Sequence, residues 1–110
     1  MEKLYSDLHE IIEREGEKIS YVLLDKANGC VSGCRCGVTV CRKTEFGNGG
    51  THEDQEGFFV LSGKGMAKVG DTEFEVHEGV AFIVPAQVNH TLRSVSPKEP
   101  LLVFWFHSAV

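Results

Sequence analysis

The sequence lacks a long hydrophobic run and any excess of basic residues. No apolar stretch approaches the roughly 20 residues that a membrane-spanning helix needs. The opening residues, MEKLYSD, show neither the basic nor the apolar segment of a signal peptide. Eleven Lys and Arg stand against sixteen Asp and Glu, for a formal charge of −5, which gives no general attraction for nucleic acid. We therefore expect a cytoplasmic protein with neither a membrane nor a nucleic-acid partner.

The length and composition fit one folded domain. The chain has 110 residues, of which 42% are hydrophobic and 25% charged, values close to those of ordinary globular proteins. Because single domains cluster at roughly 100 to 150 residues, a second folded unit is not expected.

The four cysteines do not form a recognisable metal or disulfide pattern. Cys30, Cys34, Cys36 and Cys41 follow a C-x3-C-x-C-x4-C spacing, which lacks the paired C-x2-C motifs of a zinc ribbon. We interpret them as thiols that pack as small buried hydrophobic side chains on a strand. A zinc or redox site is the alternative.

The chain changes from helical to strand periodicity near residue 19. Residues 2–15 place four apolar side chains at helical spacing, and Gly16 follows as a typical helix end. From Ile19 onward, short apolar segments are separated by turn residues, which predicts an all-β region. The strands that we expect are 21–24, 37–42, 58–61, 66–69, 72–76, 80–84, 91–95 and 101–106.

Two local patterns predict how strands are joined and covered. Gly70 supplies the positive φ of a tight turn between residues 69 and 72, after which Phe74 and Val76 should face the core and Glu73 and Glu75 the solvent. The run LLVFWF at 101–106 does not alternate, so we expect both of its faces to be covered. Closure of a barrel or a second subunit would do this, and we expect a homodimer.

Two segments carry candidate metal ligands. Residues 50–63, GTHEDQEGFFVLSG, place His52 and Glu56 on either side of an expected turn, so that both could project from one face of an antiparallel pair. Residues 79–94, GVAFIVPAQVNHTLRS, end a strand at Pro85 and open the next one near His90. Together they offer two imidazoles and one carboxylate.

These two segments resemble the paired motifs of the cupin superfamily, G-x5-H-x-H-x3,4-E-x6-G and G-x5-P-x-G-x2-H-x3-N. The second motif matches at Gly79, Pro85 and His90, whereas Gln87 and Ser94 replace its inner glycine and its asparagine. The resemblance implies a cupin-type double-stranded β-helix, or jelly-roll, barrel over residues 17–110. Residues 1–16 would be an amphipathic helix packed on that barrel.

The first motif can be aligned in two ways. In the alignment that we prefer, His52 is the second histidine, Gly50 occupies the position of the first, and Glu56 and Gly63 keep the family spacing. In the other, His52 is the first histidine and Asp54 takes the second position, which leaves a very tight hairpin before Glu56. Asp54 is therefore a secondary candidate ligand.

The resemblance implies one divalent transition metal, Fe, Mn, Ni or Zn, bound by His52, Glu56 and His90. Cys41 or Cys36 could add a soft ligand, whereas His77 should be a surface residue and neither His9 nor His107 has an evident partner. Cupins include oxygenases, isomerases, lyases and binding proteins. We therefore expect either a metal-dependent enzyme, for example a dioxygenase, acting on a small polar molecule, or a noncatalytic small-ligand sensor, with a structural dimer as a third hypothesis.

Overall fold

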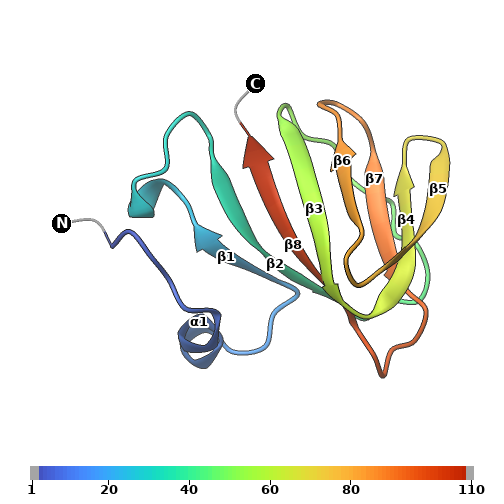
Figure 1. Cartoon of the computed structure of the whole chain (residues 1–110), viewed down its shortest axis with the longest axis horizontal. Coiled ribbons are helices and arrows are strands. Elements are labelled where there is room, and N and C mark those ends of the chain that lie inside the picture. The colour runs from blue at the N-terminus through green and yellow to red at the C-terminus, as the bar shows by residue number, and fades with distance from the viewer. Residues whose placement is uncertain (1–2, 109–110) are drawn as a thin grey trace.

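The computed structural model describes residues 3–108, which form two antiparallel sheets (Figure 1). The larger sheet has the strand order β1-β2-β8-β3-β6 and the smaller one the order β5-β4-β7. The elements are α1 (Leu8–Glu15), β1 (Ser20–Leu24), η1 (Lys26–Asn28), β2 (Arg35–Cys41), β3 (Gln55–Ser62), β4 (Lys64–Val69), β5 (Thr72–His77), β6 (Ala81–Val84), β7 (His90–Ser94) and β8 (Leu101–Ser108).

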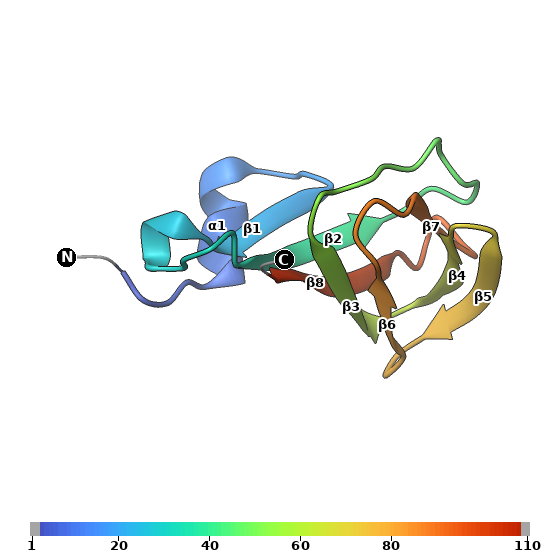
Figure 2. The ribbon, with the colours of Figure 1, turned by 90° about the horizontal axis from the view of Figure 1, so that it is seen from above.

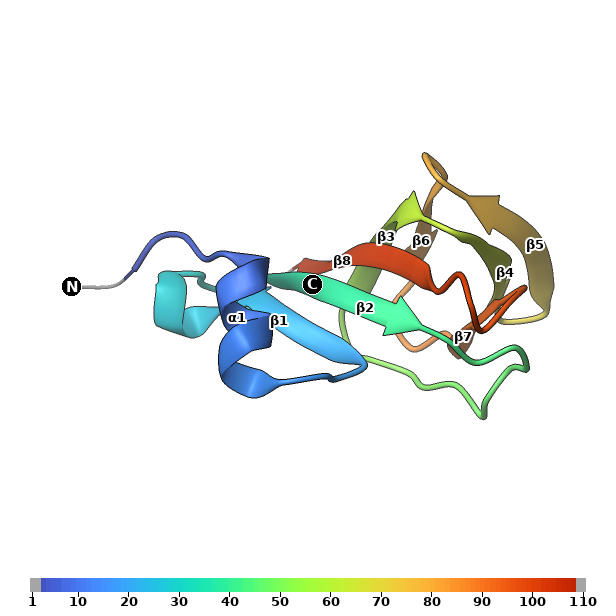
Figure 3. The same ribbon diagram turned by 90° about the horizontal axis from the view of Figure 1, so that it is seen from below.

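All eight expected strands are present, and the architecture is the predicted jelly roll with one N-terminal helix. Figures 2 and 3 show that the small sheet curves over the β3 and β6 half of the large sheet, while β1 and α1 extend from its other side. No helix within residues 3–108 is long and apolar enough to cross a membrane.

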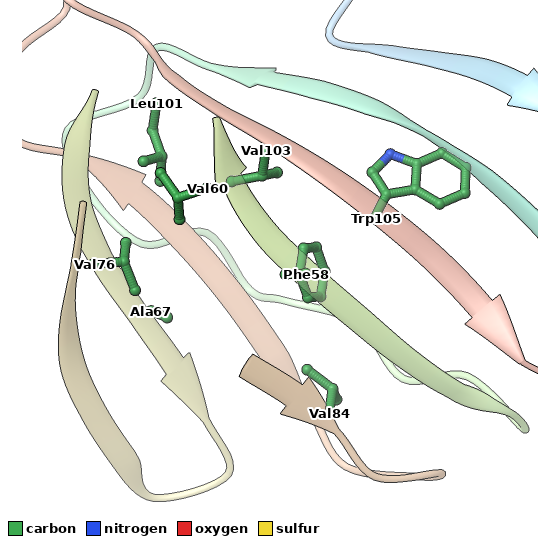
Figure 4. Close-up of a cluster of buried hydrophobic side chains, with 8 residues drawn as sticks. All are labelled: Phe58, Val60, Ala67, Val76, Val84, Leu101, Val103 and Trp105. Atoms are coloured by element: carbon green, nitrogen blue, oxygen red, sulfur yellow. The ribbon is translucent and has the colours of Figure 1, made fainter. Parts of the chain in front are cut away.

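The core fills the space between the two sheets and consists of side chains from alternate strand positions (Figure 4). On β8, Leu101, Val103 and Trp105 are buried, whereas Leu102 and Phe104 are half-buried and Phe106 is exposed. We expected both faces of this strand to be buried, but within one chain its outer face, with Leu102, Phe104 and Phe106, remains partly exposed. The core comprises Phe58, Val60, Ala67, Val76, Val84, Leu101, Val103 and Trp105.

The tight turn after β4 forms as predicted. Val69 pairs with Thr72 across a two-residue connection, and Gly70 has a φ of +58°. Along β5, Val76 is buried and Phe74 half-buried, whereas Glu73 and Glu75 are exposed. The alternation thus follows the prediction because each side chain on a strand projects opposite to its neighbours.

The predicted helix was too long. Residue 2 lies outside the described residues, and residues 3–7 are not helical. Asp7 ends the extended segment because its side chain accepts a hydrogen bond from the backbone N–H of His9, which makes Asp7 the N-cap. The helix buries Ile11 and lies next to β1. The neighbouring Tyr21 hydroxyl donates to Gly16 O and accepts from Lys18 N, which holds the turn between them.

The cysteine prediction was wrong in detail. All four are free thiols and none is fully buried, Cys34 being exposed. Cys30 and Cys34 lie in the connection before β2, where Ser32 and Gly33 both have positive φ. Only the two later cysteines lie on the strand.

Candidate metal centre

Three side chains from separate elements meet at one end of the barrel. His52 lies in the irregular segment before β3, Glu56 is the second residue of β3, and His90 is the first residue of β7. One ligand atom of each lies within 4.8 Å of the others. Glu56 Oε1 is 3.0 Å from His90 Nε2 and 3.3 Å from His52 Nε2. One carboxylate oxygen therefore faces both imidazoles.

Backbone hydrogen bonds hold the two histidines in place. Gly50 and His90 form a reciprocal bridge, with N···O distances of 3.1 and 3.0 Å. The N–H of Gln87 donates to His52 O at 2.7 Å, and Gln87 itself adopts a φ of +67° in the turn before β7. These bonds attach the segment around His52 to the second motif.

The hairpin expected between His52 and Glu56 does not form. Residues 51–54 belong to no strand, and β3 begins earlier than predicted, at Gln55. The two side chains approach because His52 is held by Gln87 and Glu56 projects inward from β3, not because they flank a two-stranded turn.

The centre is open on one side. The side chains of Glu56 and His90 are only 8% and 12% exposed, whereas that of His52 is 38% exposed. The pKa of His90 is raised above its ordinary value, mainly because it hydrogen-bonds to the Glu56 carboxylate, while burial opposes the shift. A metal ion and a proton would compete for the same ring nitrogen of His90.

The donor set fits a divalent transition metal. Ligand atoms about 2.0 to 2.2 Å from a common ion, at angles near 90° to 110°, lie about 2.8 to 3.6 Å apart. The two measured separations from Glu56 Oε1 fall in this range. Two imidazoles and one carboxylate suit Fe, Mn, Ni or Zn and leave coordination positions free for other ligands.

His107 is a residue of this centre that sequence reasoning missed. It is 3% exposed, its Nδ1 donates to Asp54 Oδ1 at 2.9 Å, and its Nε2 lies 3.3 Å from Glu56 Oε2. Its ring is also edge-on to that of His52, with centroids 4.9 Å apart. A sequence signal was present, since His107 continues the inward alternation of Val103 and Trp105 on β8.

Asp54 contacts His107 and lies outside the cluster of three possible ligands. Burial raises the pKa of Asp54, but the hydrogen bond and the charge of His107 outweigh it, so the pKa lies below its ordinary value. Gly50, by contrast, is directly opposite His90, and paired residues in antiparallel strands project to the same side. This geometry favours the alignment in which Gly50 marks the replaced histidine.

Cys41 and Cys36 are not in the cluster either. Among residues 3–108, no group of three close ligating side chains includes a cysteine. Cys41 lines the pocket beside the three residues, but its Sγ faces the carbonyl oxygens of Leu92 and Lys43 at 3.7 and 3.9 Å. Burial raises the pKa of this thiol. His77 is a surface residue, as expected.

The three residues line a cavity of about 550 Å³ that opens between the end of β2 and the start of β7. Its walls include the apolar residues Ile19, Val40, Phe58 and Leu92. The cavity is also lined by four charged residues, Glu17, Lys18, Arg42 and Lys43. Cavities of this size commonly hold small molecules.

In this jelly-roll barrel, two histidines and a glutamate line a cavity with apolar walls. Proteins of this class are able to hold a metal beside a small-molecule pocket. Comparison with family models gives a match to the cupin domain over residues 44–107, more than half of the chain. The protein belongs to the cupin family. No curated protein matches the sequence.

Solved structures show the same fold at low sequence identity. The cupin domain of Schizosaccharomyces pombe Cnp3 superposes with a TM-score of 0.71 at 18% identity, covering 83% of this chain and 60% of that one. TT1209 from Thermus thermophilus gives 0.68 at 18% identity, covering 96% and 97%. FeII HppE in complex with substrate gives 0.67 at 19% identity, covering 82% and 53%. These likenesses establish the fold.

The raised pKa of His90 predicts a pH-dependent contribution to stability in the metal-free protein. The protonated His90–Glu56 pair stabilises the fold fully below the pKa of an unfolded histidine, about 6.5, and this contribution is lost as pH rises through the raised folded value. The Tm difference between wild type and His90→Gln should therefore be largest at mildly acidic pH and should shrink as the pH rises through the raised pKa of His90. A difference that grows with pH would contradict this assignment.

The position of Gly50 predicts that a fourth ligand can be added. A Cβ at Gly50 would meet no atom within 4 Å, and it would project on the same side as His90. Gly50→His should tighten metal binding by at least about tenfold, or roughly 1.4 kcal/mol, in a competition assay with a chromophoric chelator. Gly47→His is the matched control, since Gly47 also has open space. Equal affinities for the two variants would refute the preferred alignment.

Proposed function

We propose that this cupin binds one divalent first-row transition metal, Fe, Mn, Ni or Zn, through His52, Glu56 and His90 and acts as a metal-dependent enzyme on a small molecule. An oxygenase, an isomerase or a lyase would each suit such a centre. The observation that supports the proposal is the position of these three residues on the wall of a 550 Å³ cavity. A bound ion would thus face a space large enough for a substrate.

The number of ligands also supports a catalytic role. Structural metal sites are usually closed by four protein ligands, whereas catalytic sites keep positions for substrate or water. Three protein donors at this centre, with His52 partly exposed, leave such positions on the cavity side. A bound metal would supply Lewis acidity or, as Fe(II), reactivity toward dioxygen.

The cavity walls refine the kind of small molecule. Apolar side chains line the cavity together with the candidate ligands, and Arg42 and Lys43 line it just after the end of β2. Phe58 and Leu92 would exclude water from the reacting end of a substrate. We therefore propose a substrate with a polar, metal-coordinating group attached to an apolar part, which is less polar than the sequence alone suggested.

The metal proposal predicts the metal content of the purified protein. Wild type reconstituted with excess Fe(II), Mn(II), Ni(II) or Zn(II) should retain about one equivalent of at least one of these ions after desalting. His52→Ala and His90→Ala should lose it, because each removes one of three donors. His77→Ala is the control, since His77 is an exposed β5 residue outside the cluster. Elemental analysis measures the result, and retention of none of the ions by wild type would refute the proposal.

Catalysis is tested separately from metal binding. Oxygen uptake by the Fe(II) form should be screened with thiols, diketones, catechols and sugar acids, and the Zn(II) and Mn(II) forms with the same compounds by mass spectrometry. Turnover that requires His90 supports the enzyme. Tight reversible binding of one compound without turnover would instead support the noncatalytic small-ligand sensor.

We also propose a homodimer formed through the outer face of the large sheet. Ile83 on β6 and Phe106 on β8 both pair with Gly57 on β3, so the two side chains lie in one row across three strands. Ile83, Phe59 and Phe106 are 50%, 43% and 42% exposed. A contiguous apolar strip of this kind is typical of an interaction surface, and a second copy offers the same strip in return.

The dimer proposal predicts the effect of a charge in this strip. Wild type at micromolar concentration should have twice the monomer mass of 12.1 kDa by light scattering, and Ile83→Glu should shift it toward the monomer. A buried unpaired carboxylate would oppose association. Val31→Glu, at an exposed position in the loop before β2, adds the same charge elsewhere and should leave the mass unchanged. A monomeric wild type would count against the proposal.

A further inference from the structure

The two oxygens of the Glu56 carboxylate have different surroundings. Oε1 faces His52 and His90, the two imidazoles of the candidate centre. Oε2 faces away from this pair, toward Nε2 of His107 at 3.3 Å. His107 therefore contacts the carboxylate oxygen that the other two histidines do not face. Its ring lies edge-on to that of His52, with centroids 4.9 Å apart, but it is outside the group whose ligand atoms lie within 4.8 Å of one another.

His107 is itself firmly held. It is paired directly with Glu56 across β3 and β8, and its side chain is 3% exposed. Nδ1 donates to Asp54 Oδ1 at 2.9 Å, which fixes the rotation of the ring. The ring is also edge-on to Trp105, with centroids 5.5 Å apart. A side chain with both nitrogens facing carboxylates and one edge against an indole has little freedom to turn.

We propose that His107 is a positioning residue that restrains Glu56 to offer only Oε1 to the metal. The proposal rests on the metal centre proposed above. With Oε2 facing His107 at 3.3 Å, the carboxylate would bind a metal through one oxygen and would leave a further coordination position free. Asp54 acts through His107, because its hydrogen bond sets the direction of the ring. Partners that orient metal ligands in this way commonly change metal affinity about 10- to 100-fold when they are removed.

The test uses the Co(II) form, whose visible absorption responds to coordination number and geometry. His107→Leu removes the contact to Oε2, so the carboxylate can turn and bind through both oxygens. The variant should show a changed Co(II) spectrum and a Co(II) affinity about 10- to 100-fold lower. His107→Gln keeps an N–H donor and should recover part of the wild-type spectrum. His77→Leu, on exposed β5, is the matched control and should leave both measurements unchanged.

Asp54→Asn provides a second, milder variant in case His107→Leu does not fold. Its side chain is 24% exposed, and the substitution preserves size while weakening the charged hydrogen bond to His107. The Co(II) spectrum should shift in the same direction as that of His107→Leu, by a smaller amount. Circular dichroism establishes that each variant is folded before its spectrum is interpreted.

Three outcomes would overturn the proposal. If the Co(II) spectra and affinities of His107→Leu and Asp54→Asn match those of wild type, His107 does not position Glu56, although the metal centre stands. If pulsed electron paramagnetic resonance of the Cu(II) form counts three coordinated imidazoles in wild type and two in His107→Leu, His107 is a ligand. If wild type binds neither Co(II) nor any of Fe(II), Mn(II), Ni(II) and Zn(II), the positioning role falls together with the proposed function.

Discussion

The burial of one carboxylate, that of Glu56, is the constraint on which the candidate centre depends. Glu56 projects from the inner face of β3 and its side chain is 8% exposed. A carboxylate removed from water without partners costs several kcal/mol, and this cost disappears only if hydrogen-bond donors or a cation surround it. His90 forms a hydrogen bond with this carboxylate, and a ring nitrogen of His52 and one of His107 each lie 3.3 Å from one of its oxygens. The arrangement of three histidines around one acid follows from this requirement.

Because successive side chains alternate between the two faces of a strand, β3 and β8 each contribute to more than one part of the protein. On β3, Glu56, Phe58 and Val60 face inward and form one end of the centre and part of the core, whereas Phe59 faces outward. On β8, alternate residues divide in the same way between core and outer surface. The inner faces of β3 and β8 therefore carry both core residues and residues of the centre, whereas the outer face carries the exposed Phe59 and Phe106.

Much of the fold and the main part of the centre could be predicted from the sequence. Strand positions followed from short apolar segments and turn residues, and motif spacing identified His52, Glu56 and His90, which the structure brings together. The prediction of a hairpin between His52 and Glu56 was wrong because β3 already begins at Gln55. His52 and Asp54 are instead held by long-range hydrogen bonds to Gln87 and His107. His107 was missed because its partners, Asp54 and Glu56, are about fifty residues away and meet it only through strand pairing. Asp7 is the N-cap, so the helix begins later than predicted. An aspartate before a helical segment is a local sequence signal that was present but not used.

The connection between β2 and β3 has a consequence for how the protein folds. Residues 42–54 contain no strand, and the backbone bonds that tie them down run to the region of β7, from Gly50 to His90, from Gln87 to His52 and from Ser94 to Lys43. These contacts join residues about 35 to 50 positions apart, so the chain must close long loops before any of them can form. Contacts between residues this far apart slow folding. An ion shared by His52 and His90 would add a cross-link between these two parts of the chain, and its binding energy would then count toward the stability of the folded state.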